Sequence, residues 1–333
     1  MSRLILITQG DPGGIGPEAA LRAYLTYRPQ RAVFVGDINV IKDAMRLINN
    51  STLRINTVEN PLDGIFDGST LNVVNVTVAG QYEKRRATKE GGLLSARCIE
   101  KAVELILNGE GEALVTAPIS KEALKLAGIP YPGHTEMLAA LTDTENFAMM
   151  LVGGTLRVML VTIHEALSNV PHLITKDRVV KTLILANAAA YMLGIDTPKI
   201  AVSALNPHAG EAGLFGREEI VEIVPAIEEA ARMGIAATGP FPADTLFYKA
   251  YRGQVDIVVA MYHDQGLIPL KMAAFESGVN ITIGLPIIRT SPDHGTAYDI
   301  AYNSKSAVNP QSMCEAMRLA ETLRPYVPTC RYD

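Results

Sequence analysis

Short apolar runs that alternate with longer amphipathic stretches recur along the whole chain. Some of them, such as VMLVTI at 158–163 and IVVAMY at 257–262, are continuously apolar rather than alternating. Strands of this kind are covered on both faces, as in a parallel sheet flanked by helices. Because strand and helix patterns take turns, the sequence predicts the α/β class. The predicted strands span residues 4–8, 32–37, 69–76, 112–118, 147–152, 157–164, 199–205, 256–263 and 279–286.

The length and charge of the chain narrow its organisation and its partners. With 333 residues the chain favours two domains, because single cores stop growing at about 250–300 residues. A net charge of −5 without a basic stripe argues against nucleic acid as a partner. No apolar run reaches the roughly 18 residues of a membrane span. The three cysteines, Cys98, Cys314 and Cys330, are odd in number and far apart in the sequence, which suggests a reducing compartment without a disulfide framework. We expect a soluble, cytoplasmic protein without a membrane partner.

Three of the six histidines close an apolar run in the same way. His164 and His263 end predicted strands, and His208 lies just past one. Ligands of open α/β sheets collect beyond the carboxyl ends of the strands. Three imidazoles delivered to that edge would make a divalent-metal site with open positions for substrate. For each histidine alone, the alternative is a hydrogen-bonded loop residue.

Polar residues near these strand ends add candidate contacts. Asp264 follows His263 and is placed to orient a ligand imidazole. His134 and Thr135 stand at a predicted helix start, where Thr135 is either a cap or part of an anion site. The remaining candidates are ordinary surface residues one by one, and together they suit a phosphate or carboxylate: Lys271, Asn280 and Arg289.

The stretch GDPGGIGPEA near the start of the chain has two interpretations. Gly14, Gly16 and Ala19 follow a predicted strand and open a helix, as in a dinucleotide-binding fold. Asp37 closes the next strand at about the right distance for a ribose-binding acid. Alternatively, the glycines only shape a tight turn before a helix that begins near Pro17.

Seven motifs follow one another across nearly the whole chain: GDPGGIGPE, TAPISKEAL, YPGHTE, NPHAGE followed by GLFGREE, GPFPADTLF, YHDQGLIPLK and GVNITIGLPIIRTSPDHGTAYDIA. Together they make the chain resemble the 4-hydroxythreonine-4-phosphate dehydrogenase family of vitamin B6 synthesis. The resemblance implies an isocitrate/isopropylmalate dehydrogenase-like fold, in which two α/β domains flank an active-site cleft. The first domain would comprise residues 1–130 and 275–333 with the cofactor loop, and the second residues 131–274 with the metal ligands and the dimer contact.

The resemblance also implies a set of site residues. One divalent cation per subunit (zinc, cobalt or magnesium) would be held by His164, His208 and His263, and these ligands would be shared between the subunits of a homodimer with its active site at the interface. The implied substrate contacts are His134, Thr135, Lys271, Asn280 and Arg289, and the implied contacts of NAD or NADP are Asp293, His294, Gly295 and Thr296. Lys271 is the first candidate for proton transfer, followed by Asp244 and Asp264.

With the cofactor near HGTAYDIA, the glycine turn is expected to line the cleft instead of holding a pyrophosphate. Gly13, Gly14 and Gly16 would then shape this turn. Family members usually have alanine at the position of Gly14, so we expect a looser turn in this chain.

The implied reaction is the NAD(P)-dependent oxidation and decarboxylation of 4-phosphooxy-L-threonine to 3-amino-2-oxopropyl phosphate, in the synthesis of pyridoxal 5′-phosphate. Paralogous enzymes act on D-threonate or D-erythronate 4-phosphate, and the motifs fit both branches. The more distant alternatives are a metal-dependent lyase or hydrolase without NAD, and a two-domain protein that only binds a phosphorylated metabolite.

Overall fold

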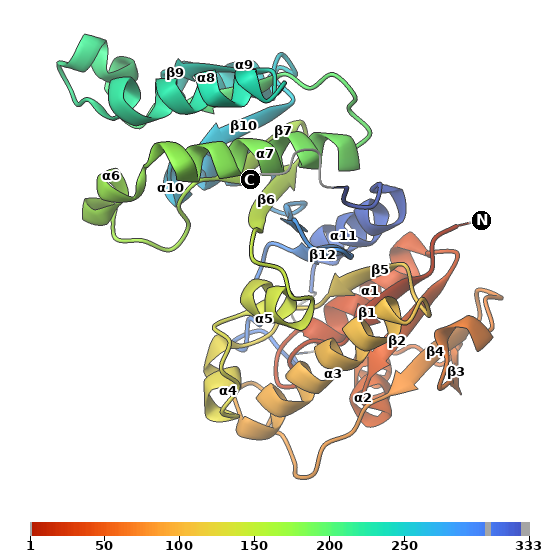
Figure 1. Cartoon of the computed structure of the whole chain (residues 1–333). Helices are drawn as coiled ribbons and strands as arrows, with labels where there is room; N and C mark the ends of the chain where they lie inside the picture. Colours follow the sequence, from red (N-terminus) through yellow and green to blue (C-terminus); the bar gives the residue numbers. More distant parts are fainter. Residues whose placement is uncertain (1, 304–307, 328–333) are drawn as a thin grey trace. The chain divides into compact units, whose positions relative to one another are not determined.

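The structure, a computed structural model, describes residues 2–303 and 308–327 and divides them into two compact units. Of the described residues, those up to Glu145 and those from Ile287 to Leu323 form unit 1. Asn146–Pro286 and the described residues from Arg324 onward form unit 2. Figure 1 shows the chain coloured along its sequence, with unit 1 in red to yellow and blue and most of unit 2 in green to cyan.

Unit 1 is built on a parallel sheet. Its strands are β1 (Ile5–Thr8), β2 (Ala32–Gly36), β3 (Arg54–Thr57), β4 (Thr70–Asn75), β5 (Ala113–Thr116) and β12 (Ile288–Pro292). They lie in the order β3-β4-β2-β1-β5-β12, and each neighbouring pair is parallel. The helices are α1 (Gly16–Tyr27), α2 (Ile38–Leu47), α3 (Lys89–Leu107), α4 (Lys121–Leu126), α5 (His134–Leu141) and α11 (Gln311–Thr322), and a 3-10 turn spans Pro61–Asp63. Helices α3 and α11 both pack on β1 and β5, and every residue of β1 is buried.

Unit 2 has a mixed sheet in the order β11-β6-β7-β10-β8-β9. Its strands are β6 (Ala148–Gly153), β7 (Leu156–Leu160), β8 (Ile200–Ser203), β9 (Ala237–Phe241), β10 (Ile257–Ala260) and β11 (Val279–Ile283). Strand β6 is antiparallel to β11 and β7, whereas β7, β10, β8 and β9 run parallel. The helices are α6 (Val170–Leu173), α7 (Lys176–Met192), α8 (Val224–Arg232), α9 (Ala243–Tyr251) and α10 (His263–Ala274), and shorter turns span Leu167–Asn169, Pro207–Gly213 and Glu219–Ile223. Both units alternate strands and helices, which confirms the predicted α/β class.

The boundaries between the units differ from the expected ones at 130/131 and 274/275. Helix α5 packs on α3 and therefore belongs to unit 1. Strand β11 pairs with β6 and therefore belongs to unit 2. Near the C-terminus, the backbone N–H of Arg324 donates to the carbonyl of Met192 at 2.7 Å. This bond attaches the described residues from Arg324 onward to unit 2 instead of unit 1.

Side-chain caps explain where several helices begin. The side chains that accept a backbone N–H at the first turns of α2, α3, α4 and α7 are those of Asp37, Thr88, Ser120 and Thr175. The Asp37 carboxylate accepts from the N–H of Asn39 at 2.7 Å. The candidate ribose-binding acid of a dinucleotide fold is therefore occupied as a helix cap.

Two of the three cysteines lie on helices of unit 1. Cys98 on α3 and Cys314 on α11 are buried and free of disulfides, whereas Cys330 lies outside the described residues. Burial raises the pKa of both buried thiols, which keeps them protonated. In the part of the chain that the structure describes, no helix is both long enough and apolar enough to cross a membrane.

Candidate active site

Two of the three candidate metal-binding histidines lie near each other in unit 2. His164 follows β7, and His263 opens α10, which begins three residues after the end of β10. Strands β7 and β10 are parallel neighbours, so their carboxyl ends share one edge of the sheet. The centroids of the two imidazole rings are 5.7 Å apart, and the ring planes meet at 38°. Nδ1 of His263 lies 2.7 Å from Oδ1 of Asp264, so Nε2 is the ring nitrogen that this contact leaves for another partner.

The third histidine, His208, stands in a left-handed stretch of backbone after β8. All residues from 208 to 212 have a positive φ, between 43° and 76°. The His208 ring lies 6.3 Å from the ring of Phe215. Among residues 2–303 and 308–327, no three His, Cys, Asp or Glu side chains form a group able to hold a metal ion. Within one chain the structure therefore brings His164 and His263 together without His208.

A pocket of about 590 Å³ in unit 2 collects several of the other candidates. His208, Asp244 and Asp264 line it, together with Tyr262 and Gln265. Its wall therefore holds the third histidine and both aspartates suggested for proton transfer, one of which, Asp264, contacts His263. Imidazole and carboxylate groups that converge on one pocket are the usual composition of a catalytic site.

The chemistry of these donors suits a divalent cation, but one chain supplies only part of the ligand set. An imidazole oriented by a carboxylate, as His263 is by Asp264, is the common arrangement of a metal-binding histidine. Protein-bound zinc is usually held by at least three protein ligands. The pair of His164 and His263 therefore fits a metal site whose remaining protein ligand comes from elsewhere.

Arg289 in unit 1 is a buried cation. It lies on β12 with only 2% of its surface exposed. Its Nε and Nη2 atoms donate to Oγ1 of Thr116, at the end of β5, over 3.2 and 2.8 Å. Burial lowers the pKa of Arg289 to about 9, against the opposing effect of the Glu136 carboxylate, so the guanidinium remains charged at neutral pH. A buried cation of this kind is suited to an anionic ligand.

His134 and Thr135 are the first two residues of α5. The N-cap of this helix is Gly133, so Thr135 is not the cap. Nε2 of His134 is buried and has no hydrogen-bond partner within the described residues. Burial, followed by the charge of Arg289, lowers the pKa of His134 far below its usual value and leaves the ring neutral. An unpartnered ring nitrogen near a buried cation indicates a place for a polar ligand.

The other two substrate candidates lie in unit 2. Asn280 on β11 donates from Nδ2 to Sδ of Met149 at 2.8 Å. Its Oδ1 atom is buried and lacks a hydrogen-bond partner in the described parts of the chain. Lys271 is half-buried in the last turn of α10. The substrate candidates are thus divided between unit 1, with His134, Thr135 and Arg289, and unit 2, with Lys271 and Asn280.

The glycine turn at 10–16 is held by the segment that was expected to bind the cofactor. The N–H of Ile15 donates to the carbonyl of Thr296 at 2.9 Å. A Cβ atom on Gly14 would lie 2.7 Å from the same carbonyl oxygen, so glycine is required for this close approach. Gly14 therefore tightens the packing of the turn, contrary to the expectation that it loosens it. The backbone approaches the protein's own loop here, and this supports the interpretation of the glycines as a structural turn.

The four candidate cofactor residues precede α11 in unit 1. The N–H of Asp293 donates to Oγ of Ser312 at 3.2 Å, and Nδ1 of His294 lies 3.2 Å from the carbonyl oxygen of Gly295. Nε2 of His294 is buried without a hydrogen-bond partner in the described residues. Burial lowers the pKa of His294, which favours the neutral ring. Together with Thr296, these residues lie directly beside the glycine turn.

Two residues that hold candidate site segments in place, Asp11 and Thr116, were not predicted from the sequence. Asp11 is fully buried, and its carboxylate accepts from the N–H of Gly13 and the hydroxyl of Tyr298, each at 2.8 Å. Thr116 holds the guanidinium of Arg289. Both residues stand in quoted motifs, at or just after the carboxyl ends of β5 and β1. The strand-end rule that singled out the histidines would have found them as well.

Comparisons with known proteins assign the chain to a family. Residues 28–320 match the family described as "Pyridoxal phosphate biosynthetic protein PdxA". The D-threonate 4-phosphate dehydrogenase of Pectobacterium atrosepticum is 43% identical over 331 residues, which cover 97% of this chain and 100% of that protein. The 4-hydroxythreonine-4-phosphate dehydrogenase of Desulfosudis oleivorans is 48% identical over 304 residues, 90% of each chain.

Solved structures agree with this assignment. A crystal structure of 4-hydroxythreonine-4-phosphate dehydrogenase from Klebsiella pneumoniae superposes with a TM-score of 0.88 at 40% identity, over 97% of this chain and 98% of that one. The enzyme of the same name from Burkholderia phymatum gives a TM-score of 0.84 at 39% identity, over 97% and 99% of the two chains. The chain therefore belongs to the PdxA family of pyridoxal phosphate biosynthetic proteins.

Proposed function

We propose that the protein is a metal- and NAD(P)-dependent dehydrogenase that oxidises and decarboxylates 4-phosphooxy-L-threonine to 3-amino-2-oxopropyl phosphate. The observation that carries this proposal is the pairing of His164 with His263, whose rings are 5.7 Å apart at the carboxyl ends of parallel strands. The name of the Desulfosudis oleivorans relative, 48% identical, supports the aminated substrate.

The name of the relative from Pectobacterium atrosepticum supports a second substrate, D-threonate 4-phosphate. The alignment covers that protein completely at 43% identity. The two substrates share the phosphate, the carboxylate and the hydroxyl that is oxidised. They differ at one position, where 4-phosphooxy-L-threonine has an amine and D-threonate 4-phosphate has a hydroxyl. The same residues would therefore bind most of either molecule, and only a direct comparison of the two substrates separates these functions.

The substrate phosphate would be bound by Arg289, His134 and Thr135. Arg289 supplies the charge, because its guanidinium is buried and remains protonated at neutral pH. The neutral His134 ring can donate or accept at its unpartnered Nε2 atom. Thr135, in the first turn of α5, adds a hydroxyl and a backbone N–H at the positive end of the helix. Binding energy from this remote group would position the carbon that reacts.

The reacting end of the substrate would lie near Lys271 and Asn280. Lys271 would either neutralise the carboxylate as a cation or, as the neutral amine, accept the proton of the hydroxyl. The buried Oδ1 atom of Asn280 needs a donor, which the amine or hydroxyl of the substrate would provide. Asp264 orients His263, and Asp244 lines the same pocket as a further candidate for proton transfer.

The cofactor would lie at Asp293, His294, Gly295 and Thr296, where the unpartnered Nε2 of His294 offers a polar contact. When bound, NAD or NADP accepts the hydride.

A divalent cation (zinc, cobalt or magnesium) would be held by His164, His208 and His263. When bound, it acts as a Lewis acid toward the reacting oxygen of the substrate.

Exposed apolar side chains beside two of the histidines support a homodimer. On α10, which begins with His263, they are Ile268, Met272 and the capping residue Phe275, with 58%, 85% and 78% of their surface exposed, and near His208 they are Leu214 and Phe215, with 74% and 50%. Surfaces of this kind are usually covered by a partner. A second copy that covers them would supply the histidine that completes the metal site.

The two free, buried thiols agree with a cytoplasmic protein.

The test is a direct assay with both substrates. Purified protein is stripped of metal, reloaded with zinc, cobalt or magnesium, and mixed with either four-carbon phosphate and NAD or NADP. We expect 4-phosphooxy-L-threonine to support cofactor reduction by the metal-loaded protein and not by the metal-free protein. His208→Ala should abolish turnover and leave the fold intact. His172 is an exposed histidine on α6, and His172→Ala should keep wild-type turnover. No reduction with either substrate, or full activity of the metal-free protein, would overturn the proposal.

A further inference from the structure

A second pocket, of about 670 Å³, lies in unit 1 away from every residue discussed so far. Its wall includes Ser69 and Leu53, just before β4 and β3, and Arg31, just before β2. Further parts of the wall come from the end of α1, including Tyr24, from its left-handed C-cap, Arg28, and from Phe66 in the loop before β4. The volume is in the range of about 300–1,000 Å³ found for small-molecule sites.

The position of this pocket separates it from the candidate active site. In a parallel sheet all strands point the same way, so residues that precede the strands lie at the amino edge. The glycine turn after β1 and Thr116 at the end of β5 lie at the opposite, carboxyl edge. Reactions in open α/β folds take place at that carboxyl edge. The pocket at the amino edge therefore has no part in the proposed reaction.

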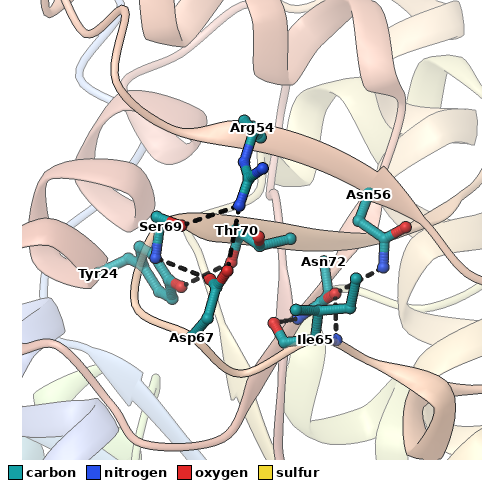
Figure 2. A network of polar contacts seen from close by, with 8 residues as sticks. All are labelled: Tyr24, Arg54, Asn56, Ile65, Asp67, Ser69, Thr70 and Asn72. Carbon is teal, nitrogen blue, oxygen red and sulfur yellow. Dashed lines mark hydrogen bonds and ion pairs between the residues drawn. The ribbon is translucent and has the colours of Figure 1, made fainter.

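Two arginines give the pocket a positive charge without a compensating carboxylate. In the described residues, neither Arg28 nor Arg31 forms an ion pair with Asp or Glu, and Nε of Arg28 donates a long hydrogen bond to the carbonyl of Leu25 at 3.4 Å. The nearby carboxylate of Asp67 is already engaged by Arg54 at 3.2 Å and by the N–H of Ser69 at 2.9 Å (Figure 2).

The Asp67 carboxylate also accepts hydrogen bonds from its own loop. Hydrogen bonds, first of all the one from the backbone of Ser69, lower the pKa of Asp67 to about 2. Figure 2 shows dashed lines from the Asp67 carboxylate to Arg54 and to Ser69, on the loop that leads into β4. The charge of Arg28 and Arg31 is thus left for a ligand.

Aromatic and apolar side chains form the rest of the wall. The guanidinium carbon of Arg31 lies over the Phe66 ring, 5.4 Å from its centre, which fixes this cation against one face of the ring. Tyr24 is held rigidly, because its hydroxyl donates to the carbonyl of Thr70 at 3.2 Å and its ring packs edge-on against Phe34 at 5.7 Å. Leu53 adds a buried aliphatic surface. A ligand ring can lie on these groups without displacing them.

We propose that this pocket is a binding site for a small aromatic phosphate monoester, with its phosphate between Arg28 and Arg31 and its ring against Phe66 and Tyr24. A phosphate monoester carries nearly two negative charges at neutral pH, which matches two guanidinium groups that lack carboxylates. Arginine forks bind such oxyanions through paired hydrogen bonds. The flat surface of Phe66 then selects a ligand with a ring over free phosphate.

The test uses phenyl phosphate as the probe, with inorganic phosphate and phenol as its two halves. In the intact protein with labelled leucine methyl groups, phenyl phosphate should shift the signals of Leu25 and Leu53, which line the pocket. Arg31→Gln and Arg28→Gln should each weaken this binding by about tenfold, the loss expected for one charged hydrogen bond. Arg97→Gln, at a surface pair with Glu100 on α3, is the matched control and should bind as the wild type does.

A third variant keeps the test informative if an arginine substitution perturbs folding. Phe66→Leu retains both charges and should weaken phenyl phosphate several-fold, while it leaves the binding of inorganic phosphate unchanged. The proposal is overturned if phenyl phosphate binds both arginine variants as tightly as the wild type. It is equally overturned if no signal of Leu25 or Leu53 moves at saturating probe. Because the probe lacks the reacting groups of the proposed substrates, failure here leaves the proposed dehydrogenase activity untouched.

Discussion

The hydroxyl of Tyr298 donates a hydrogen bond of 2.8 Å to the buried carboxylate of Asp11, although 287 positions separate the two residues. A second bond of the same kind runs from the hydroxyl of Tyr302 to the carbonyl of Pro12 at 2.5 Å. Arg85 adds a third connection, because its N–H donates to the carbonyl of Gly13 at 2.8 Å and its guanidinium binds the carbonyl of Asp299 at 2.7 Å. These bonds hold the glycine turn against the candidate cofactor segment.

Tyr298→Phe should destabilise unit 1. The substitution removes a hydrogen bond to a buried carboxylate, so the free energy of unfolding should fall by about 1.5–3 kcal/mol. Urea denaturation at neutral pH measures this change. Tyr251→Phe, at an exposed tyrosine on α9, is the matched control and should leave the unfolding free energy unchanged. Equal unfolding midpoints for Tyr298→Phe and the wild type would contradict the inferred importance of this bond.

The stability of the protein should carry a pH signature of Asp11. Burial raises the pKa of Asp11 above its ordinary value of 3.8, so the folded chain binds this proton more tightly than the unfolded chain. The stability that follows from this difference is present below pH 3.8 and is lost as the pH rises through the folded-state pKa. The unfolding free energy of the wild type, minus that of Asp11→Asn, should therefore fall through this window and then level off. Urea titrations across that acid range would refute the assignment if this difference were constant or rose.

Gly14→Ala should disturb the same region by a steric route. The added Cβ atom would lie 2.7 Å from the carbonyl oxygen of Thr296, closer than real contacts allow, so one of the two loops must move. Overpacking of this kind costs about 1–3 kcal/mol of unfolding free energy, and the displaced segment should also bind NAD or NADP more weakly. For stability, Gly295→Ala is the matched control, since its Cβ atom would meet nothing within 4 Å. Thermal or urea unfolding that ranks the two variants equally would rule out this explanation.

The sequence predicts the buried parallel strands well, and it fails where polar residues enter the sheet. Runs such as Ile5–Ile7 are fully buried, as their apolar character requires. Strand β12, with the sequence IRTSP, was not predicted, because Arg289 interrupts its apolar pattern; in the fold the guanidinium donates to the hydroxyl of Thr116 on the neighbouring strand β5. Strands β3 and β9 were also missed. Their short, partly exposed sequences RINT and ATGPF lack a continuous apolar pattern.

The candidate site was predicted to a similar extent. The proximity of His164 and His263 follows from one rule about strand ends, since β7 and β10 are parallel neighbours. His208 obeys the same rule in sequence, yet the backbone after β8 turns through residues with positive φ. Ala209 and Ala212 adopt this conformation without being glycine, so no local signal announces the turn. The position of His208 is thus set by tertiary structure instead of by its distance from a strand.

Arg289→Gln should weaken substrate binding more than it slows the chemical step. The variant keeps a polar side chain near Thr116 and removes the buried charge that we assign to the phosphate. Loss of a charged hydrogen bond predicts a KM about 10–100-fold higher, with a much smaller change in kcat. Steady-state kinetics with varied substrate measures both constants, and Arg318→Gln, at a surface pair with Glu315, is the control. An unchanged KM would show that the phosphate is bound elsewhere.

The proposed sharing of metal ligands between two copies predicts complementation between inactive variants. His164→Ala and His208→Ala should each be inactive as homodimers, because every site lacks one ligand. In a mixed dimer, one site combines both substitutions, and the other combines His164 of one chain with His208 of the other. With random pairing half of the dimers are mixed, so coexpression should restore about a quarter of the wild-type activity.

This outcome depends on the geometry of the site and not on stability alone. If all three histidines came from the same chain, no mixed dimer would contain an intact site, and coexpression would restore nothing. Coexpression of His164→Ala with His172→Ala serves as the reference, since the second substitution lies on α6, outside the site, and leaves complete chains in the mixture. Analytical ultracentrifugation of each variant establishes that a dimer is present. Dimeric protein without recovered activity would place His208 with the histidines of its own chain and would remove the main argument for a shared site.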